Sequence, residues 1–338
     1  MRAHRARSAV RRLAVLGLGL GLGLWLAGTW GLAVAQEGPY PQKPLRFVVP
    51  LTAGGPTDTL ARIVATPLAL KLKQPILVDD RPGAGGNIAA EFVARSPADG
   101  YTLFVAGNGA LAINPSIYRK IGYDPLKDFA PVAQLASAPY VLAVNAKVPV
   151  STVRELIAYA KANPGKLNFG AVQGSGSHLA MELFARMAGV KMTLIPYKGA
   201  APATNDLVAG QIDVSFASTP VVMPHVKAGR LKALGVTSRA RIAQLPEVPT
   251  IAESGLPGYE ATVWYGVAAP AGTPAAIVEQ LSRQIAEVVH DKEVHERMLA
   301  NDFDPGVTTP AQFGAYMKSE YDKWARVVKD AGVRAPDE

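Results

Sequence analysis

The chain has 338 residues, of which 49% are hydrophobic and 18% are charged. This composition excludes an intrinsically disordered protein and is sufficient for one large domain or two ordinary ones. The formal net charge of +8 raises the question of a nucleic-acid or anionic-membrane partner. The absence of cysteine excludes disulfides, thiolate metal ligands and a lipid anchor on an N-terminal cysteine.

The N-terminus has the order of a secretory signal peptide. Five arginines precede an uncharged stretch, Leu13 to Ala35, which ends in the small residues AVA. Cleavage after Ala35 lowers the formal charge from +8 to +3. Export, this low charge and the lack of a basic stripe together argue against nucleic-acid binding. Residues 1–35 are therefore expected to be a cleavable signal.

An uncleaved membrane anchor is the alternative, because the apolar stretch approaches the length of a membrane span. Its Gly-Leu alternation is a poor helix former, and its end fits a peptidase site. We expect a mature protein that begins at Gln36 and is located in a bacterial periplasm. The pair Arg11-Arg12 leaves both Sec and twin-arginine export open.

After the signal, strand-like and helix-like stretches alternate along the chain. Helical spacing of apolar residues is clear at Val153, Leu156 and Ala160. Such alternation predicts βαβ units, parallel sheets and helices on both faces, which is the α/β class. The predicted strands are Leu45–Pro50, Ile76–Val78, Tyr101–Ala106, Val141–Asn145, Leu167–Val172, Thr193–Tyr197, Ile212–Phe216, Lys232–Thr237 and Tyr265–Pro270.

The number of strands predicts two lobes. The pattern restarts near Val141, and after a proline-rich and turn-rich stretch one more strand, beginning at Tyr265, leads into C-terminal helices. We expect the first lobe to comprise residues 36–142 and 259–338, and the second lobe to comprise residues 143–258. Each lobe is expected to hold a mainly parallel sheet flanked by helices.

Two loops follow strands and lead directly into helices. In the first, Gly54 and Gly55 allow close approach of a ligand, and Thr57 or Asp58 can cap the helix. Ligands of open α/β sheets bind beyond the carboxyl ends of strands, where helix N-termini favour anions. An Asp58 that faced a carboxylate directly would repel it, unless it received an ammonium or hydroxyl group.

The second loop has the sequence QGSGSH and ends at His178, where a helix begins. It again collects glycines, hydroxyls and backbone N–H groups at a strand-to-helix junction. Two anion-suited loops on two lobes predict a clamp around a small acid.

Enzyme and metal interpretations find little support. Ser177 and His178 are adjacent on a nascent helix and do not face each other, and GSGS is not a nucleophile elbow. Neither a dinucleotide-binding glycine pattern nor a P-loop is present. His290 and His295 are five residues apart and lie on different faces of a predicted helix. We expect no catalytic residues, no metal and no cofactor.

A set of motifs resembles one known family along nearly the whole mature chain. The chain resembles the Bug family, the TctC-type extracytoplasmic receptors of tripartite tricarboxylate transporters. The motifs that carry the resemblance are VVPLTAGGPTD, RPGAGGNIAAEFVARSPADGYTL, NPSIY, HLAMELFARMAG, PYKGAAPATNDLVAGQID, KAGRLKALGVTSRARIAQLPEVPTIAESGLPGYE and WYGVAAPAGTP.

The resemblance implies a type II periplasmic binding protein fold with a ligand cleft between the two lobes. It implies a small organic carboxylate as ligand and a membrane permease of two subunits, one large and one small, as partner. A monomer is expected from the habit of such receptors. The ligand residues that the resemblance implies, on the two loops, are Ala53, Gly54, Gly55, Asp58, Ser175, Gly176, Ser177 and His178; Thr57 is counted with them.

Four further positions are candidates for contact with the ligand. Asn108 and Tyr265 are expected to face the cleft or to have structural roles. Ala217 and Ser218 stand where many members of the family carry an acid and an amide, which argues against an amino-acid ligand. The pair Asp79-Asp80 replaces the commoner Glu-Asn, and we expect this change to be silent.

Two other functions stay open at this point. A receptor of the same fold could serve a sensor kinase instead of a permease, and the sequence does not separate the two. A secreted serine hydrolase that uses Ser175 and His178 is the weaker alternative.

Overall fold

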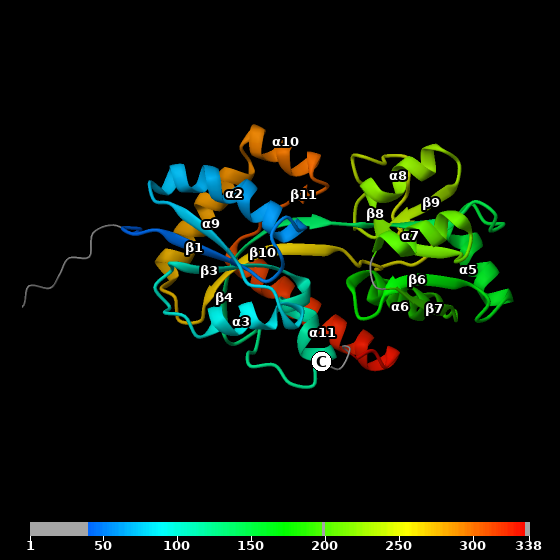
Figure 1. The fold of residues 1–338 in the computed structure, drawn as a ribbon, viewed down its shortest axis with the longest axis horizontal. Helices are drawn as coiled ribbons and strands as arrows, with labels where there is room; N and C mark the ends of the chain where they lie inside the picture. Colours follow the sequence, from blue (N-terminus) through cyan, green and yellow to red (C-terminus); the bar gives the residue numbers. More distant parts are fainter. Residues whose placement is uncertain (1–39, 198–199, 335–338) are drawn as a thin grey trace, which may run out of the picture. The chain divides into compact units, whose positions relative to one another are not determined.

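The computed structural model describes residues 40–197 and 200–334 (Figure 1). The predicted signal, residues 1–35, lies outside the described residues. The described residues from Lys43 onward, 43–197 and 200–334, belong to one compact unit. Among the described residues, no helix combines the length and the apolar character that crossing a membrane requires.

The first sheet has the strand order β11-β4-β10-β3-β1-β2. β1 pairs with β2 and β3 in parallel, whereas β10 runs antiparallel to β3 and β4. α2 and α9 cover one face of the sheet, and α3 and α11 cover the other (Figure 1). The elements of this part are β1 (Leu45–Val49), α2 (Pro56–Leu72), β2 (Ile76–Asp80), η1 (Ala84–Gly86), α3 (Asn87–Ala94), β3 (Thr102–Gly107), the π-helix η2 (Gly109–Ile113), α4 (Asn114–Ile117), β4 (Phe129–Ala138), β10 (Val263–Pro270), α9 (Ala275–Val289), α10 (Lys292–Ala300), β11 (Asp304–Pro305) and α11 (Pro310–Ala331).

The second sheet has the strand order β7-β6-β8-β5-β9. β6 runs parallel to β7 and β8, and β5 is antiparallel to both of its neighbours. α5 and α6 lie on one face, and α7 and α8 lie on the other (Figure 1). The elements are β5 (Tyr140–Asn145), α5 (Val153–Ala162), β6 (Asn168–Val172), α6 (Gly176–Ala188), β7 (Thr193–Tyr197), α7 (Ala200–Ala209), β8 (Val214–Ser218), α8 (Thr219–Lys227) and β9 (Leu231–Val236).

The chain passes between the sheets at two places. It leaves the first sheet at Pro139, between β4 and β5, and it returns between β9 and β10. The expected boundary after residue 142 thus falls inside β5, whose partners belong to the second sheet. The strands β4 and β11 were not among the predicted ones, and they complete one side of the first sheet.

A buried carboxylate fixes α11 to the first sheet. Glu320 is 3% exposed, and its Oε2 accepts hydrogen bonds from the indole Nε1 atoms of Trp264 at 3.0 Å and Trp324 at 2.9 Å. Lys323 forms an ion pair with the other carboxylate oxygen. One side chain of α11 therefore satisfies two buried donors, one on β10 and one on α11 itself.

Replacement of Glu320 by alanine should destabilise the fold strongly. The variant leaves two buried indole N–H groups without an acceptor and removes the ion-pair partner of Lys323, which keeps only the carbonyl of Glu260. We therefore expect a loss of about 3 to 5 kcal/mol in unfolding free energy. Urea denaturation measures the loss. Glu320→Gln, which keeps an acceptor oxygen, should lose less, and the surface change Glu296→Ala should stay within about 0.5 kcal/mol. Equal stability of Glu320→Ala and the parent protein would contradict this role.

Candidate ligand-binding site

The loop between β1 and α2 is held by its own side chains. Gly54 has a φ of +79°, and its N–H donates to Oδ2 of Asp58 at 2.7 Å. The N–H of Gly55 donates to the carbonyl of Thr52 at 3.2 Å, and Pro56 opens the helix. Asp58 is 3% exposed, so its carboxylate lies beneath the loop and braces it.

The loop between β6 and α6 repeats this geometry in the second lobe. Gly174 has a φ of +78°, and its N–H donates to Nδ1 of His178 at 3.0 Å. The N–H of Ser175 donates to the carbonyl of Val172 at 3.0 Å, as Gly55 does to Thr52. In both loops a left-handed glycine is tied to the side chain four residues later, just inside the helix.

The two helix N-termini differ in their capacity for an anion. Gly176 and Ser177 occupy the first turn of α6, where backbone N–H groups have no carbonyl acceptor within the helix. In α2 the first position is Pro56, which has no N–H, and the Asp58 carboxylate lies in the first turn. The N-terminus of α6 is therefore the better anion site.

Arg62 partly offsets the negative charge near α2. Its Nε lies 2.7 Å from Oδ1 of Asp58, and its Nη2 lies 3.1 Å from Oδ2 of Asp80. Burial, and after it the neighbouring Asp58 carboxylate, raises the pKa of Asp80. The acidic pair at the end of β2 thus takes part in local ion pairs, because Asp79 also contacts Arg81, at 2.8 Å.

A cavity of about 210 Å³ opens beside the start of α6 in the second lobe. Four predicted site residues line it: Ser175, Ser177, Ala217 and Ser218. Ser175 and Ser177 lie where β6 leads into α6, and Ala217 and Ser218 end β8, so two strand ends converge on one cavity. The other lining residues are Tyr140, Gly170, Ala171, Val172, Ala200, Ala203, Thr204, Ser215, Phe216 and Val221.

Tyr140 is a residue of this cavity that the sequence did not suggest. It opens β5 directly after the crossing at Pro139, and its hydroxyl lies so close to Gly176 that a β-carbon there would be 2.8 Å away. Its backbone N–H donates to Oγ1 of Thr237 at 2.8 Å, which holds the residue at the crossing. The available signal was an aromatic residue that follows a proline at a lobe boundary.

The remaining predicted residues lie elsewhere. Ala53 and Gly54 are exposed on the first loop, and Thr57 is buried. The amide of Asn108 donates to the carbonyl of Thr262 at 3.4 Å. Tyr265 is 7% exposed and packs edge-on against Phe303. The structure does not bring these residues into the second-lobe cavity.

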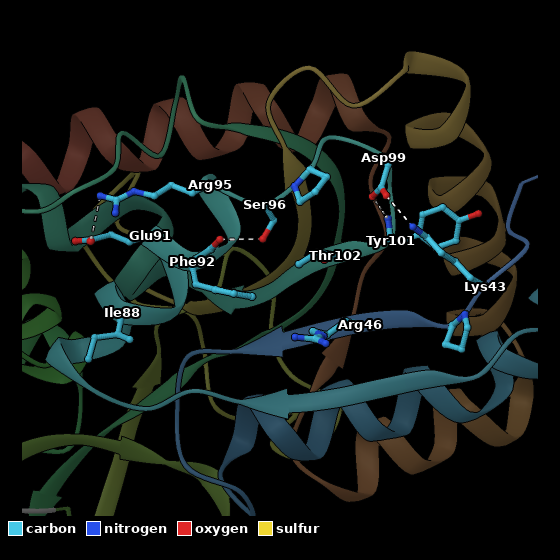
Figure 2. A pocket seen from close by; sticks show the side chains of 12 residues that line it. Lys43, Arg46, Ile88, Glu91, Phe92, Arg95, Ser96, Asp99, Tyr101 and Thr102 are labelled. Atoms are coloured by element: carbon cyan, nitrogen blue, oxygen red, sulfur yellow. Dashed lines mark hydrogen bonds and ion pairs between the residues drawn. The ribbon is translucent and has the colours of Figure 1, made fainter.

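A larger hollow of about 770 Å³ lies on the first lobe, between α3 and the beginnings of β1 and β3 (Figure 2). Its cationic side chains already have partners, since Lys43 contacts Asp99 at 3.1 Å and Arg95 contacts Glu91 at 3.7 Å. The candidate loops follow the carboxyl ends of the strands, and this hollow lies at the opposite ends. None of the predicted site residues lines it.

The arrangement around His178 does not form a nucleophile and base. Nδ1 of His178 accepts the Gly174 N–H, and Nε2 lies 3.5 Å from Oε1 of Glu182. Oγ of Ser175 lies 3.0 Å from Oγ of Ser177 and accepts the backbone N–H of His178. Both imidazole nitrogens are thus directed to groups other than Ser175. Within residues 40–197 and 200–334, no three His, Asp or Glu side chains are grouped to hold a metal.

The chain forms two sheets, each flanked by helices, and passes between them twice. Helix N-termini lie at the strand ends. This architecture defines a two-lobed binding protein. The chain belongs to the family described as "Tripartite tricarboxylate transporter family receptor", which matches residues 60–333. BugT of Bordetella pertussis is 38% identical over 327 residues, which cover 96% of this chain and 98% of BugT. The resemblance noted from the sequence motifs is confirmed.

Solved structures confirm the periplasmic binding protein fold. A structure titled as an R. palustris protein with adipate is 39% identical and has a TM-score of 0.71 over 88% of this chain and 99% of that one. A TctC solute binding protein from Polaromonas, solved without ligand, is 30% identical and has a TM-score of 0.79 over 86% and 100%. MatC from Rhodopseudomonas palustris with bound malate is 32% identical, with a TM-score of 0.67 over 86% and 100%.

The second lobe receives a carboxylate from the first-sheet part of the chain. Asp302, which has a φ of +66°, accepts a hydrogen bond from the backbone N–H of Thr219 at the start of α8. Burial raises the pKa of Asp302 to about 6, and the Thr219 N–H opposes this shift in part. The folded protein therefore holds the Asp302 proton more tightly than the unfolded chain does.

This difference in pKa predicts a pH dependence of stability. Between about pH 4 and pH 6 the folded state binds more protons at Asp302, so the unfolding free energy should fall as the pH rises. In Asp302→Asn, the part of this decrease in unfolding free energy that Asp302 causes should be absent. The exposed control Asp322→Asn should retain it. Chemical denaturation at several pH values measures the effect. Identical pH profiles of Asp302→Asn and the parent protein would contradict it.

A second prediction concerns the brace under the second loop. His178→Ala removes the acceptor of the Gly174 N–H, so we expect a loss of about 1 to 3 kcal/mol in unfolding free energy. His225→Ala, on the partly exposed side of α8, should change it by no more than about 0.5 kcal/mol. Urea denaturation compares the two variants, and equal losses would show that the brace has no special role.

Proposed function

We propose that this receptor captures a small carboxylate between its two lobes and delivers it to a two-subunit membrane permease. The observation that carries the proposal is the N-terminus of α6, which presents backbone N–H groups beside a hydroxyl-bearing cavity. A carboxylate there satisfies donors that the helix leaves open and interacts favourably with the helix dipole. The relatives with adipate and malate support this class of ligand.

The ligand contacts are proposed for both loops and for the cavity. From the second lobe, Ser175, Gly176 and Ser177 would hold the carboxylate, with Ala217 and Ser218 beside the rest of the ligand. From the first lobe, Ala53 and Gly54 would approach through exposed backbone. Gly55, Thr57, Asp58 and His178 would act by shaping the loops, in view of their burial or hydrogen bonds.

Closure of the two lobes around the ligand would be possible because each lobe has its own sheet. Lobe 1 is proposed to hold the first sheet and lobe 2 the second, with the hinge at Pro139 and in the return between β9 and β10. In the open form, one loop alone would hold the carboxylate weakly. Both loops can contact the same ligand only when the lobes approach each other. The closed form is the one that a permease should recognise.

The setting of this function is proposed to be the periplasm. Family membership supports a receptor outside the cytoplasm, and the N-terminal sequence supports export with cleavage after Ala35. The mature protein is proposed to act as a monomer, to require no cofactor and to bind no nucleic acid.

A thermal unfolding assay tests the receptor function. The mature protein, from Gln36 onward, is heated with each of a panel of carboxylic acids at fixed salt. Binding to the folded state alone should add about 2.7 kcal/mol of stability at a hundred times the dissociation constant. A rise in Tm with at least one acid is expected.

A variant and a control make the assay specific. In Ser175→Ala the rise should shrink, because the variant disturbs the cap of α6 beside the proposed carboxylate position. In Thr152→Ala, which removes the cap of the distant α5, the rise should persist. Absence of any shift, in protein unfolded and refolded to remove copurified ligand, would contradict the carboxylate receptor.

A further inference from the structure

The walls of the second-lobe cavity are mainly apolar. Apolar side chains from two strand ends and two helices line it: Ala171, Val172, Ala203, Phe216, Ala217 and Val221. Beneath them, Phe216 stacks on Tyr259 with ring centroids 6.3 Å apart, and Phe184 packs against both rings. Such a wall favours the apolar part of a ligand, since each buried apolar surface is removed from water.

Two hydroxyl groups in the wall already donate their hydrogen bonds to backbone carbonyls of the protein. Oγ of Ser215 donates to the carbonyl of Gly170 at 2.8 Å, and Oγ1 of Thr204 donates to the carbonyl of Ala200 at 3.0 Å. A hydroxyl has one hydrogen, so neither group is left to donate to a ligand. Toward a ligand in the cavity, both hydroxyls can act only as acceptors.

Tyr140 contributes a donor at the mouth of the cavity. Its ring packs on Phe216 with centroids 6.4 Å apart, and its hydroxyl lies at the start of α6, next to Gly176. Burial raises the pKa of Tyr140, so the phenol keeps its proton and acts as a donor. The hydroxyl and the N–H groups of α6 therefore converge on one region.

We propose that Tyr140 holds the ligand carboxylate together with the start of α6, while an apolar chain or ring of the ligand fills the cavity, whose wall selects that apolar body. The inference rests on the proposed function and adds the class of ligand to it. The cavity volume of about 210 Å³ favours a small body. The cavity disfavours acids that carry several hydroxyl or amino groups between or beside their carboxylates.

The physical reason is the cost of taking polar groups from water. A ligand hydroxyl that enters the cavity without a partner costs about 1 to 3 kcal/mol on the scale of protein mutations, and each methylene gains affinity by burial. Ala217, near the end of β8, contributes its methyl group to this apolar wall.

A matched pair of probes tests the apolar body. Adipate and galactarate have the same chain length and the same two carboxylates, and galactarate carries four additional hydroxyls. Isothermal titration calorimetry on the mature protein should give a Kd for adipate at least tenfold below that for galactarate. In the series butanoate, pentanoate, hexanoate, each methylene should lower Kd about fourfold. Equal or tighter binding of galactarate overturns the inference.

Tyr140→Phe tests the donor separately, because it removes only the hydroxyl. We expect Kd for adipate to rise about tenfold, as for loss of a hydrogen bond to a charged group, while the adipate-to-galactarate ratio is unchanged. Tyr159→Phe, on α5 of the same lobe and outside the cavity walls, should leave Kd unchanged. A parental Kd in Tyr140→Phe, with normal folding by circular dichroism, overturns the role of Tyr140.

The outcomes separate this inference from the function on which it rests. If galactarate, malate or citrate binds and adipate and hexanoate do not, the receptor for carboxylates stands and the apolar ligand class falls. If no carboxylate in the panel binds the refolded protein, both fall together.

Discussion

The N–H groups in the first turn of a helix have no carbonyl within reach, and the fate of these groups governs the candidate site. In both lobes a left-handed glycine turns the chain from strand to helix, and a side chain four residues later accepts the glycine N–H. The tie fixes the loop that leads from the strand into the helix. The same glycine-to-side-chain hydrogen bond occurs in both loops, so the two strand-to-helix junctions are similar.

The two junctions nevertheless have different electrostatic character. Asp58 performs in α2 what the imidazole of His178 performs in α6, so one junction contains a carboxylate and the other a ring nitrogen. Pro56 further removes a donor from α2. An anion consequently meets a donor-rich partner in the second lobe and a more neutral one in the first.

The sequence was informative where local pattern and tertiary role agree. Glycine-rich strand-to-helix junctions could be located because glycine, serine and a following apolar helix are adjacent in the chain. β4 escaped prediction because Phe129–Ala138 contains Pro131 and many small residues, and its pairing with β10 comes from far along the chain. The brace by Asp58 and His178 depends on a left-handed turn, and Tyr140 reaches the cavity only through the register of β5. Both features depend on the three-dimensional fold and cannot be predicted from the spacing of residues along the sequence.

The helix α11 contacts elements of both parts of the fold. It is continuous from Pro310 to Ala331, packs near its start against β10 and is joined near its end to α6 through Arg186 and Asp330, 2.7 Å apart. A regular helix does not bend sharply without a proline or a similar break in its interior. One unbroken helix is therefore shared by the two parts of the chain, since its start packs on β10 and its last turns lie beside α6.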